Sequence, residues 1–254
     1  MRIKVLTLFP EMFAPLSASI LGRAEKAGLL SVETLDIRAF TNDKHRRCDD
    51  YPFGGGPGMV MTAQPLHDAF LSATRGFAAR RVLLSPKGRT LTQRRAMELA
   101  KEEGLILLCG HYEGVDQRAI DLWVDEEISI GDYVLTGGEL AAMVLIDALA
   151  RHVPGVLGDE TSAAEESFME GLLEYPQYTR PAEFLGLRAP EELLSGAHKK
   201  IEAWRREKML TETRERRPDL FEKLELSADD RVLLGLEERK PRRRRSQNRE
   251  RDEK

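Results

Sequence analysis

The feature that most constrains the fold is an alternation of short apolar runs with helical patterns over the first 150 residues. The runs with strand character cover residues 3–9, 32–37, 81–84, 105–109 and 125–130. Helical periodicity falls on residues 13–27, 63–73, 93–103 and 115–122. Thr62 and Thr92 stand directly before two of these segments and are residue types that cap helix N-termini well. Strands that alternate with helices predict an α/β fold with a parallel sheet.

Composition favours a cytosolic protein of two domains over a disulfide-rich, secreted or membrane-spanning one. A chain of 254 residues with 41% hydrophobic content can bury a substantial core, and we expect two domains. Cys48 and Cys109 lie far apart, which favours neither a zinc site nor a disulfide framework and fits a reducing cytosol. The longest apolar stretch, residues 140–150, is shorter than the roughly 20 residues of a membrane span, so it predicts a buried helix. The N-terminus lacks the pattern of a secretory signal, and we expect a cytoplasmic protein.

Three polar or glycine-rich turns follow apolar runs. They are SPKGR after Leu84, GHYEG after Cys109, and SIGDYVLTGG from Ser129. In parallel sheets, ligands bind beyond the carboxyl ends of strands, so these turns predict a ligand site. The glycines of the third turn let the backbone approach a nucleotide-like ligand closely, although the same spacing also occurs in plain turns and caps. The sequence contains neither a GxGxxG after its first strand nor a GxxxxGK[ST], so dinucleotide and P-loop sites have no support.

The second half of the chain has a different pattern. The stretch after Arg151 is polar and without period, and it predicts a linker over residues 153–174. Helical patterns then return over residues 190–194, 196–213 and 228–236, whereas we expect no strand beyond Tyr175. The last segment, residues 237–254, has nine Lys or Arg against five Asp or Glu, and it predicts a disordered basic tail.

Two segments suggest contact with a polar partner. The glycine-rich stretch at residues 54–61 follows a charged run and predicts either a flap over a substrate or an ordinary surface loop. Eight Lys or Arg lie between Lys199 and Arg217, around Ile201, Trp204 and Leu210. That spacing puts the apolar residues near one helix face and leaves a basic surface that suits a phosphate backbone, although a solvated charged helix has the same pattern.

Other catalytic classes find little support. The histidines at positions 67, 111, 152 and 198 have no metal-ligand spacing, which argues against metal catalysis by protein ligands. The sequence also contains no GxSxG, so it offers no hydrolase nucleophile of that kind.

A set of motifs in order gives a sharper expectation. They are LFPEMF, RRCDDYPFGGGPGMVM, LLSPKGR, LCGHYEGVDQR, SIGDYVLTGGELAAMVLIDALAR, PGVLG, ESF and YPQYTRP. Together, from the first strand to about Leu236, they resemble the bacterial tRNA (guanine-N1)-methyltransferase family. The resemblance implies a SPOUT-type α/β domain with a deep trefoil knot over residues 1–152, a linker and active-site loop over 153–174, and a helical tRNA-binding domain over 175–236. It also implies an obligate homodimer.

The resemblance further implies that S-adenosylmethionine lies bent in the knot and donates a methyl group to N1 of guanosine 37 in tRNA, which helps maintain the reading frame. The cofactor-binding residues that it implies are Leu84, Ser85, Pro86, Gly110, Tyr112, Glu113, Gly114, Ile130, Gly131, Asp132, Tyr133, Val134, Leu135, Gly137 and Gly138. Family members need Mg²⁺ for efficient transfer, and this sequence shows no protein cage for the ion.

Guanine N1 carries a proton at neutral pH, so methylation needs a general base and a cation near O6. By resemblance the cation is Arg151, whose alternative role is to meet the negative end of its helix dipole. The base falls on Glu166, where the family usually has Asp, and Glu165 takes that role if the loop shifts by one residue. For both glutamates a solvated surface is the alternative.

The resemblance also marks two substrate contacts. Asp49 matches an aspartate that helps to position the guanosine, and Gln177 stands where relatives often have His. Two other functions share the cofactor turns. One is a related knotted methyltransferase that acts on another RNA, and the other is a catalytically weakened RNA-binding protein that still holds S-adenosylmethionine.

Overall fold

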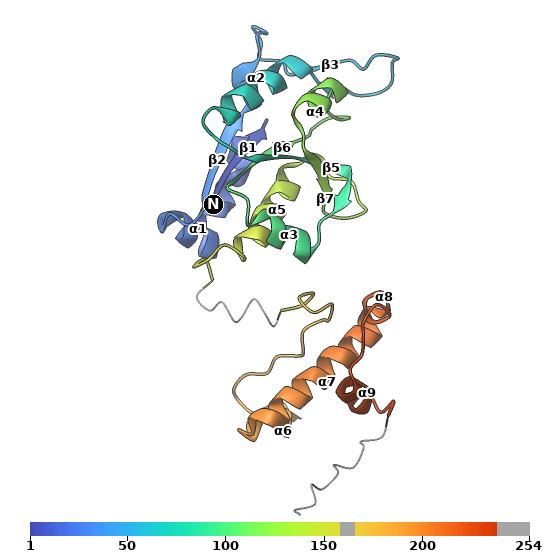
Figure 1. The fold of residues 1–254 in the computed structure, drawn as a ribbon. Coiled ribbons are helices and arrows are strands. Elements are labelled where there is room, and N and C mark those ends of the chain that lie inside the picture. Colours follow the sequence, from blue (N-terminus) through green and yellow to red (C-terminus); the bar gives the residue numbers. More distant parts are fainter. Residues whose placement is uncertain (158–165, 238–254) are drawn as a thin grey trace, which may run out of the picture. The chain divides into compact units, whose positions relative to one another are not determined.

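The chain forms two compact units, Met1–Ala164 and Glu165–Lys254. Its structure, a computed structural model, describes residues 1–157 and 166–237 (Figure 1). The boundary between the units lies within the segment that the sequence predicts as a linker.

The first unit is built on a five-stranded sheet in the order β2-β1-β6-β5-β7, with every neighbouring pair parallel. The strands are β1 (Arg2–Thr7), β2 (Ser31–Asp36), β5 (Arg80–Thr90), β6 (Gly104–Cys109) and β7 (Glu126–Ser129). All five predicted strands are therefore confirmed. Every residue of the central β6 is buried, which explains its unbroken apolar sequence, because both faces of a parallel sheet are covered by helices.

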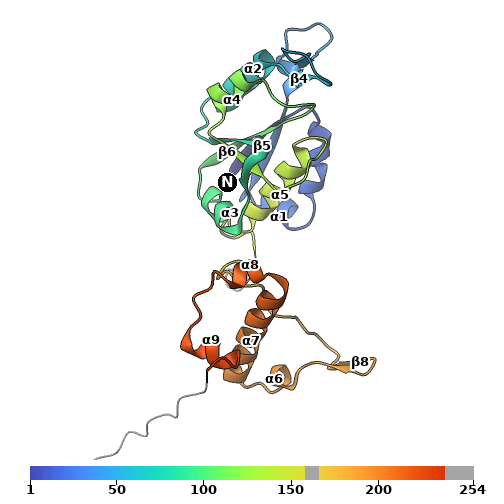
Figure 2. The same cartoon turned by 90° about the vertical axis from the view of Figure 1, so that its right-hand side faces the viewer.

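Helices cover the two faces of this sheet (Figures 1 and 2). They are α1 (Ser19–Lys26), α2 (Ala63–Thr74), α3 (Gln93–Leu99), α4 (Gln117–Trp123) and α5 (Glu139–Ala150), with the short 3-10 helices η1 (Pro10–Ser17) and η2 (Ile37–Phe40). On one face, α2 contributes Leu66 and Phe70 to a core, and on the other, α5 contributes Leu145 and Leu149 to a second core. Burying each such side chain contributes about 1.5–3 kcal/mol, so both helices are fixed firmly against the sheet.

The expected single helix over residues 13–27 is wrong. The chain forms η1 and then α1, with a break at Ala18, which is extended, and Ser19, which has φ +53°. Pro15 lies inside the first segment and lacks the N–H that an α-helix would need there. A Cβ at Gly22 would lie 2.0 Å from the Ser17 carbonyl oxygen, so the glycine allows the chain to fold back tightly at this break.

Helix termini follow the sequence only in part. Thr92 caps α3, since its hydroxyl accepts from the Arg95 N–H at 3.2 Å, as predicted. Thr62 precedes α2 without capping it, and its hydroxyl donates to the Cys48 carbonyl at 3.2 Å instead. The third predicted helix ends at Leu99, four residues early, because the chain turns there to enter the buried strand β6.

Most of the regular secondary structure in the described part of the second unit is helical. Its helices are α6 (Glu191–Leu194), α7 (His198–Arg216), α8 (Pro218–Phe221) and α9 (Ala228–Leu233). The expectation of no strand beyond Tyr175 is wrong, because β8 (Glu183–Phe184) pairs with β9 (Leu187–Arg188). Leu185 and Gly186 both have positive φ between these strands, as a type I′ two-residue hairpin turn requires.

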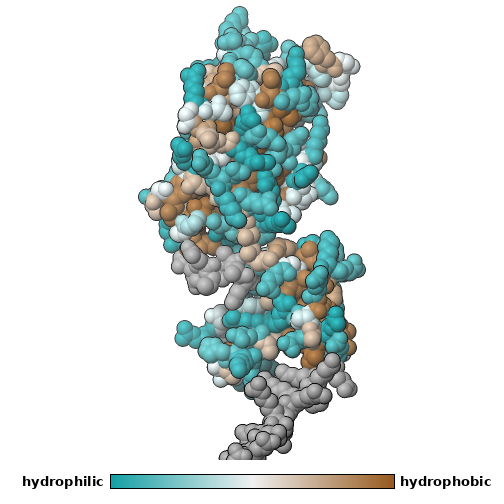
Figure 3. All heavy atoms as spheres, in the orientation of Figure 1, coloured by the Kyte–Doolittle hydropathy of each residue, from teal (hydrophilic) through white to brown (hydrophobic). Residues whose placement is uncertain are grey.

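The long helix α7 has the apolar face that its sequence predicts. Trp204 is 7% exposed and Leu210 is fully buried. In Figure 3 the visible surfaces of both units are mainly hydrophilic, with apolar atoms interspersed. Across residues 1–157 and 166–237, the helices are all too short or too polar to span a membrane.

Candidate active site

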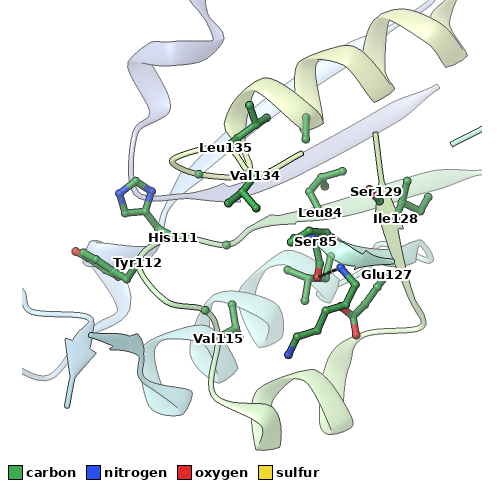
Figure 4. Close-up of a pocket in the computed structure, with 18 of the residues that line it drawn as sticks. Leu84, Ser85, His111, Tyr112, Val115, Glu127, Ile128, Ser129, Val134 and Leu135 are labelled. Atoms are coloured by element: carbon green, nitrogen blue, oxygen red, sulfur yellow. Dashed lines mark hydrogen bonds between the residues drawn. The ribbon is translucent and has the colours of Figure 1, made fainter. Parts of the chain in front are cut away.

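The three predicted turns meet at one pocket in the first unit. The second and third turns follow β6 and β7, as expected, whereas the first, residues 85–89, lies inside β5 and not after its end. The pocket that these segments line has a volume of about 330 Å³ (Figure 4). In β5, the pairing with β7 stops at Leu84 and resumes at Arg89, so the residues between them leave the ladder and form one wall. Parallel strands place these ends at one edge of the sheet, which brings together turns that are far apart in sequence.

Short backbone contacts fix the second and third turns against each other. The Gly138 N–H donates to the Gly110 carbonyl at 2.8 Å, and His111 forms an isolated bridge with Gly137. A Cβ at Gly138 would lie 2.8 Å from the Cys109 Cα, which is closer than Cβ atoms approach backbone. The glycine here therefore permits a close approach of the two chain segments.

The third turn also holds its own shape. The Ser129 hydroxyl donates to the Gly131 carbonyl at 3.0 Å, and the Tyr133 N–H donates to the same oxygen at 2.9 Å. Gly131 has φ +151°, and a Cβ there would lie 2.4 Å from the Tyr133 ring. Tyr112, in the second turn, has φ +59°, which is costly for a residue with a side chain and often marks a functional site.

All but one of the cofactor-binding residues predicted above line this pocket. The exception, Asp132, is exposed and lies outside the lining. Lining residues that the sequence prediction missed are Val60, Leu83, Lys87, His111, Val115, Gln117, Ile120, Glu127, Ile128, Ser129, Thr136 and Ala141. Lys87, His111, Ser129 and Thr136 lie inside the predicted turns, so their neighbours could have pointed to them.

Two polar atoms of the pocket are buried without a hydrogen-bond partner among the described residues: Nδ1 of His111 and Oε2 of Glu127. An unpaired buried polar atom costs about 1–3 kcal/mol, so such atoms suit a bound ligand that completes them. The His111 ring lies between Phe9 and Tyr112, with ring centroids 5.0 Å and 4.9 Å away. These contacts orient the imidazole beside the third turn.

A buried carboxylate lies beneath the third turn. Glu139 is 2% exposed and accepts a hydrogen bond from the Thr7 hydroxyl at 2.8 Å. Burial and then the charge of Glu139 raise the pKa of the Cys109 thiol well above its usual value. Burial likewise raises the pKa of Cys48 to about 11, so neither thiol supplies a thiolate nucleophile at neutral pH.

The glycine-rich stretch at residues 54–61, which the sequence predicts as a flap or a surface loop and which is called the flap below, is joined to the second turn by backbone hydrogen bonds. The short strands β3 (Asp49–Asp50) and β4 (Val60–Met61) pair with each other at the base of the flap. The Met61 N–H donates to the Gly114 carbonyl, and the Glu113 N–H donates to the Met59 carbonyl, both at 2.9 Å. The structure thus connects the predicted substrate loop with the predicted cofactor turn, which the sequence alone did not.

Asp49 lies close enough to the pocket to act on its electrostatics. It is half-buried and pairs with Met61. Burial raises the pKa of the Tyr112 hydroxyl, and the negative charge of Asp49 raises it further. Between Asp49 and the glycine-rich stretch lie Tyr51 and Phe53, which are 77% and 99% exposed and present aromatic rings to solvent.

Comparison with known proteins identifies the family to which this chain belongs. Residues 1–223 match the family described as tRNA (Guanine-1)-methyltransferase TrmD. A tRNA (guanine-N(1)-)-methyltransferase of Heliobacterium modesticaldum is 57% identical over 243 residues, covering 92% of this chain and 90% of the relative. Enzymes of the same name from Clostridium perfringens strain SM101 and Carboxydothermus hydrogenoformans are each 54% identical, over 92% of this chain and 99% and 92% of their own lengths. The chain belongs to this methyltransferase family.

For a tRNA (guanine-N1)-methyltransferase, the residues expected to act on the guanosine are spread over both units. Arg151 is the C-cap residue of α5 in the first unit. Glu166 lies in the second unit, half-buried, and its carbonyl accepts from the Met169 N–H at 3.3 Å. Gln177 is exposed, and its side-chain amide donates to the Glu174 carboxylate. Glu165 lies outside the described residues, and the catalytic roles stay predictions.

Two contacts with α7 hold the segment that follows Glu166 in place. The Leu173 N–H donates to the buried Thr213 hydroxyl of α7 at 2.8 Å. Arg206 of α7 contacts the Glu170 carboxylate at 2.8 Å. The same helix that carries the basic residues therefore anchors the segment after Glu166 at two points.

Several basic residues of α7 contact aromatic rings or carboxylates within the second unit. The Arg205 guanidinium lies 4.7 Å from the centroid of the Tyr175 ring, and Lys208 lies 6.0 Å from that of Trp204. Lys199, Lys200 and Arg214 are exposed. Of the residues that the structure describes, no group of three or more His, Cys, Asp or Glu is arranged to hold a metal ion.

Proposed function

We propose that this chain transfers a methyl group from S-adenosylmethionine to N1 of guanosine 37 in tRNA and thereby helps maintain the reading frame. One observation carries the proposal: in a chain of this family, the irregular part of β5 and the turns after β6 and β7 form a single pocket with unpaired polar atoms. The family match supports guanine-N1 methylation of tRNA. The methyl donor and the position in the tRNA are the further steps of the proposal.

The pocket fits the donor in size and chemistry. Its volume of about 330 Å³ is within the range of small-molecule sites. The turn from Ile130 to Gly138 offers backbone N–H and C=O groups, which suit an adenine edge, and His111 and Glu127 offer unpaired side-chain atoms. When bound, S-adenosylmethionine supplies an electrophilic methyl group. Residues of all three turns would hold it.

The chain must also make guanine N1 nucleophilic. We assign Glu166 the removal of the N1 proton and Arg151 the stabilisation of the negative charge that develops on O6. Glutamate keeps the carboxylate of the usual aspartate but adds a methylene, which changes its reach. Asp49 and Gln177 are assigned to guanosine contact, and Mg²⁺ is expected to assist without a protein cage.

Binding of the tRNA is assigned to the second unit. Exposed basic residues of α7, among them Lys199, Lys200 and Arg214, suit the phosphate backbone of an anticodon stem. The proposal includes a homodimer in the cytoplasm and a knotted path of the chain through the first unit, both from the family resemblance.

The deciding experiment measures transfer of labelled methyl groups from S-adenosylmethionine to tRNA transcripts that carry guanosine or adenosine at position 37. We expect label only with guanosine, and nuclease mapping should find it on N1. Equal labelling of both transcripts would refute the assigned target and favour a methyltransferase for another RNA site. Tight cofactor binding without any labelling would favour the RNA-binding protein.

A further inference from the structure

Glu126 and Glu127 are neighbours on β7 whose carboxylates have opposite environments. The Glu126 carboxylate contacts two arginines, with Arg80 Nε at 2.6 Å and Arg95 as the second partner. Successive side chains of a strand point to opposite faces, so Glu127 points to the other face of the sheet. There it lines the pocket beside Ser85, on the opposite side from His111 (Figure 4).

One oxygen of the Glu127 carboxylate has no arginine or other hydrogen-bond partner among the described residues, unlike the paired carboxylate of Glu126. This oxygen, Oε2, is buried. An ionised carboxylate can only accept hydrogen bonds, so a partner that completes it must be a donor. Because an unsatisfied buried acceptor is unfavourable, the position favours a ligand that brings hydroxyl or amino groups to this wall of the pocket.

The chemistry of S-adenosylmethionine, the proposed methyl donor, indicates which of its groups would donate hydrogen bonds to Glu127. An adenine edge presents ring-nitrogen acceptors beside its amino group, so it suits the paired N–H and C=O groups of the third turn better than a carboxylate. The ribose presents two neighbouring hydroxyls, and both can donate to one carboxylate. An acidic side chain near a strand end is also the usual partner of a ribose in other nucleotide-binding α/β sheets.

We infer that Glu127 binds the ribose of S-adenosylmethionine through its carboxylate. The inference rests on the proposed function, since it assigns a residue to the same pocket. Glu127 is thus a binding residue that the turn motifs do not contain, because it precedes the third turn on the strand itself.

The test is calorimetric titration of the full chain and its variants with 5′-methylthioadenosine, which has the nucleoside but no amino-acid group. Glu127→Ala should weaken this ligand about tenfold to a hundredfold, the range for a hydrogen bond to a charged group, and Glu127→Gln should weaken it less. Glu126→Gln is the matched control, since it removes the neighbouring charge outside the pocket, and it should change the affinity less than twofold. Thermal unfolding of each variant checks that it is folded.

A second ligand isolates the ribose. The 2′,3′-dideoxy analogue of methylthioadenosine lacks both hydroxyls, so Glu127→Ala should change its affinity less than twofold. An equal loss for both ligands would overturn the ribose assignment. So would a loss seen only with S-adenosylhomocysteine, which would place the carboxylate at the α-ammonium group.

The outcomes separate this inference from the function on which it rests. Wild-type protein that binds S-adenosylmethionine and methylates tRNA, with Glu127 variants that bind methylthioadenosine equally well, would overturn only the role of Glu127. Wild-type protein that binds none of these nucleosides would overturn the proposed function as well.

Discussion

Replacing Asp230 by Asn tests the contact that joins the helices of the second unit. Asp230 lies in the first turn of α9 with its side chain only 5% exposed. Its carboxylate accepts from Arg206 Nε at 2.8 Å and Nη2 at 3.0 Å, and from the Ser227 N–H at 3.2 Å. Arg206 also holds Glu170, so one guanidinium connects α7, α9 and the segment after Glu166.

The expected loss follows from the pKa of Asp230. The hydrogen bond from Arg206 is the main reason that this pKa falls from 3.8 to about 2. At about 1.4 kcal/mol for each pKa unit, the ionised carboxylate contributes roughly 2.5 kcal/mol to the free energy of unfolding at pH 7. Because the folded-state pKa is lowered, this contribution is complete above the unfolded value of 3.8 and is lost as the pH falls toward 2. At pH 3 about half remains.

The assay is urea unfolding of the full chain with Trp123→Phe, which leaves Trp204 as the single tryptophan and a fluorescent reporter of the second unit. In this background Asp230→Asn should lower the free energy of unfolding by roughly 2.5 kcal/mol at pH 7 and by about half as much at pH 3. Asn can still accept from Ser227, so the cap is retained. Asp219→Asn is the control, because the Asp219–Arg217 pair is exposed and should contribute little.

Equal losses for Asp230→Asn at both pH values would refute the linkage argument, because the cost would then be independent of ionisation. A loss near zero at pH 7 would show that the contact with Arg206 does not stabilise the unit.

Three further predictions concern catalysis, the cofactor turns and tRNA binding by the tail. Glu166→Gln and Arg151→Ala should each lower the single-turnover rate at saturating cofactor by at least about a hundredfold, while Glu166→Asp retains more activity than Glu166→Gln. A normal rate in Glu166→Gln would show that the base lies elsewhere, and Glu165 would be the next residue to test. Gly138→Ala should lower the free energy of unfolding by about 1–3 kcal/mol, because the added Cβ would collide with the backbone at Cys109. The same variant should bind S-adenosylmethionine more weakly in calorimetry. Unchanged stability and affinity would contradict the packing argument. Deleting the chain from Lys240 onward should weaken tRNA binding mostly at low salt, and an unchanged salt slope of the binding constant would reject a role for the tail.

The sequence determined the sheet and most of its helices, because their signals are local. The apolar run of β6 and the period of α2 follow from what each element buries. The split between η1 and α1 escaped this reasoning although Pro15 is visible, because apolar residues continue at helical spacing on both sides of it. The pairs β3–β4 and β8–β9 escaped it too, since strands of two residues have no periodicity to read.

The sequence also predicted the segments that line the pocket, because segments at the carboxyl ends of parallel strands share one edge of the sheet. Only the tertiary structure decided which side chains enter it. Gln117 and Ile120 reach the pocket from α4, and Glu127 reaches it from β7, through the packing of elements whose sequences carry no ligand signal. The hydrogen bonds that join the flap to Glu113 and Gly114 are likewise decided by folding, because they connect backbone groups that are distant in sequence and that every residue type except proline would supply.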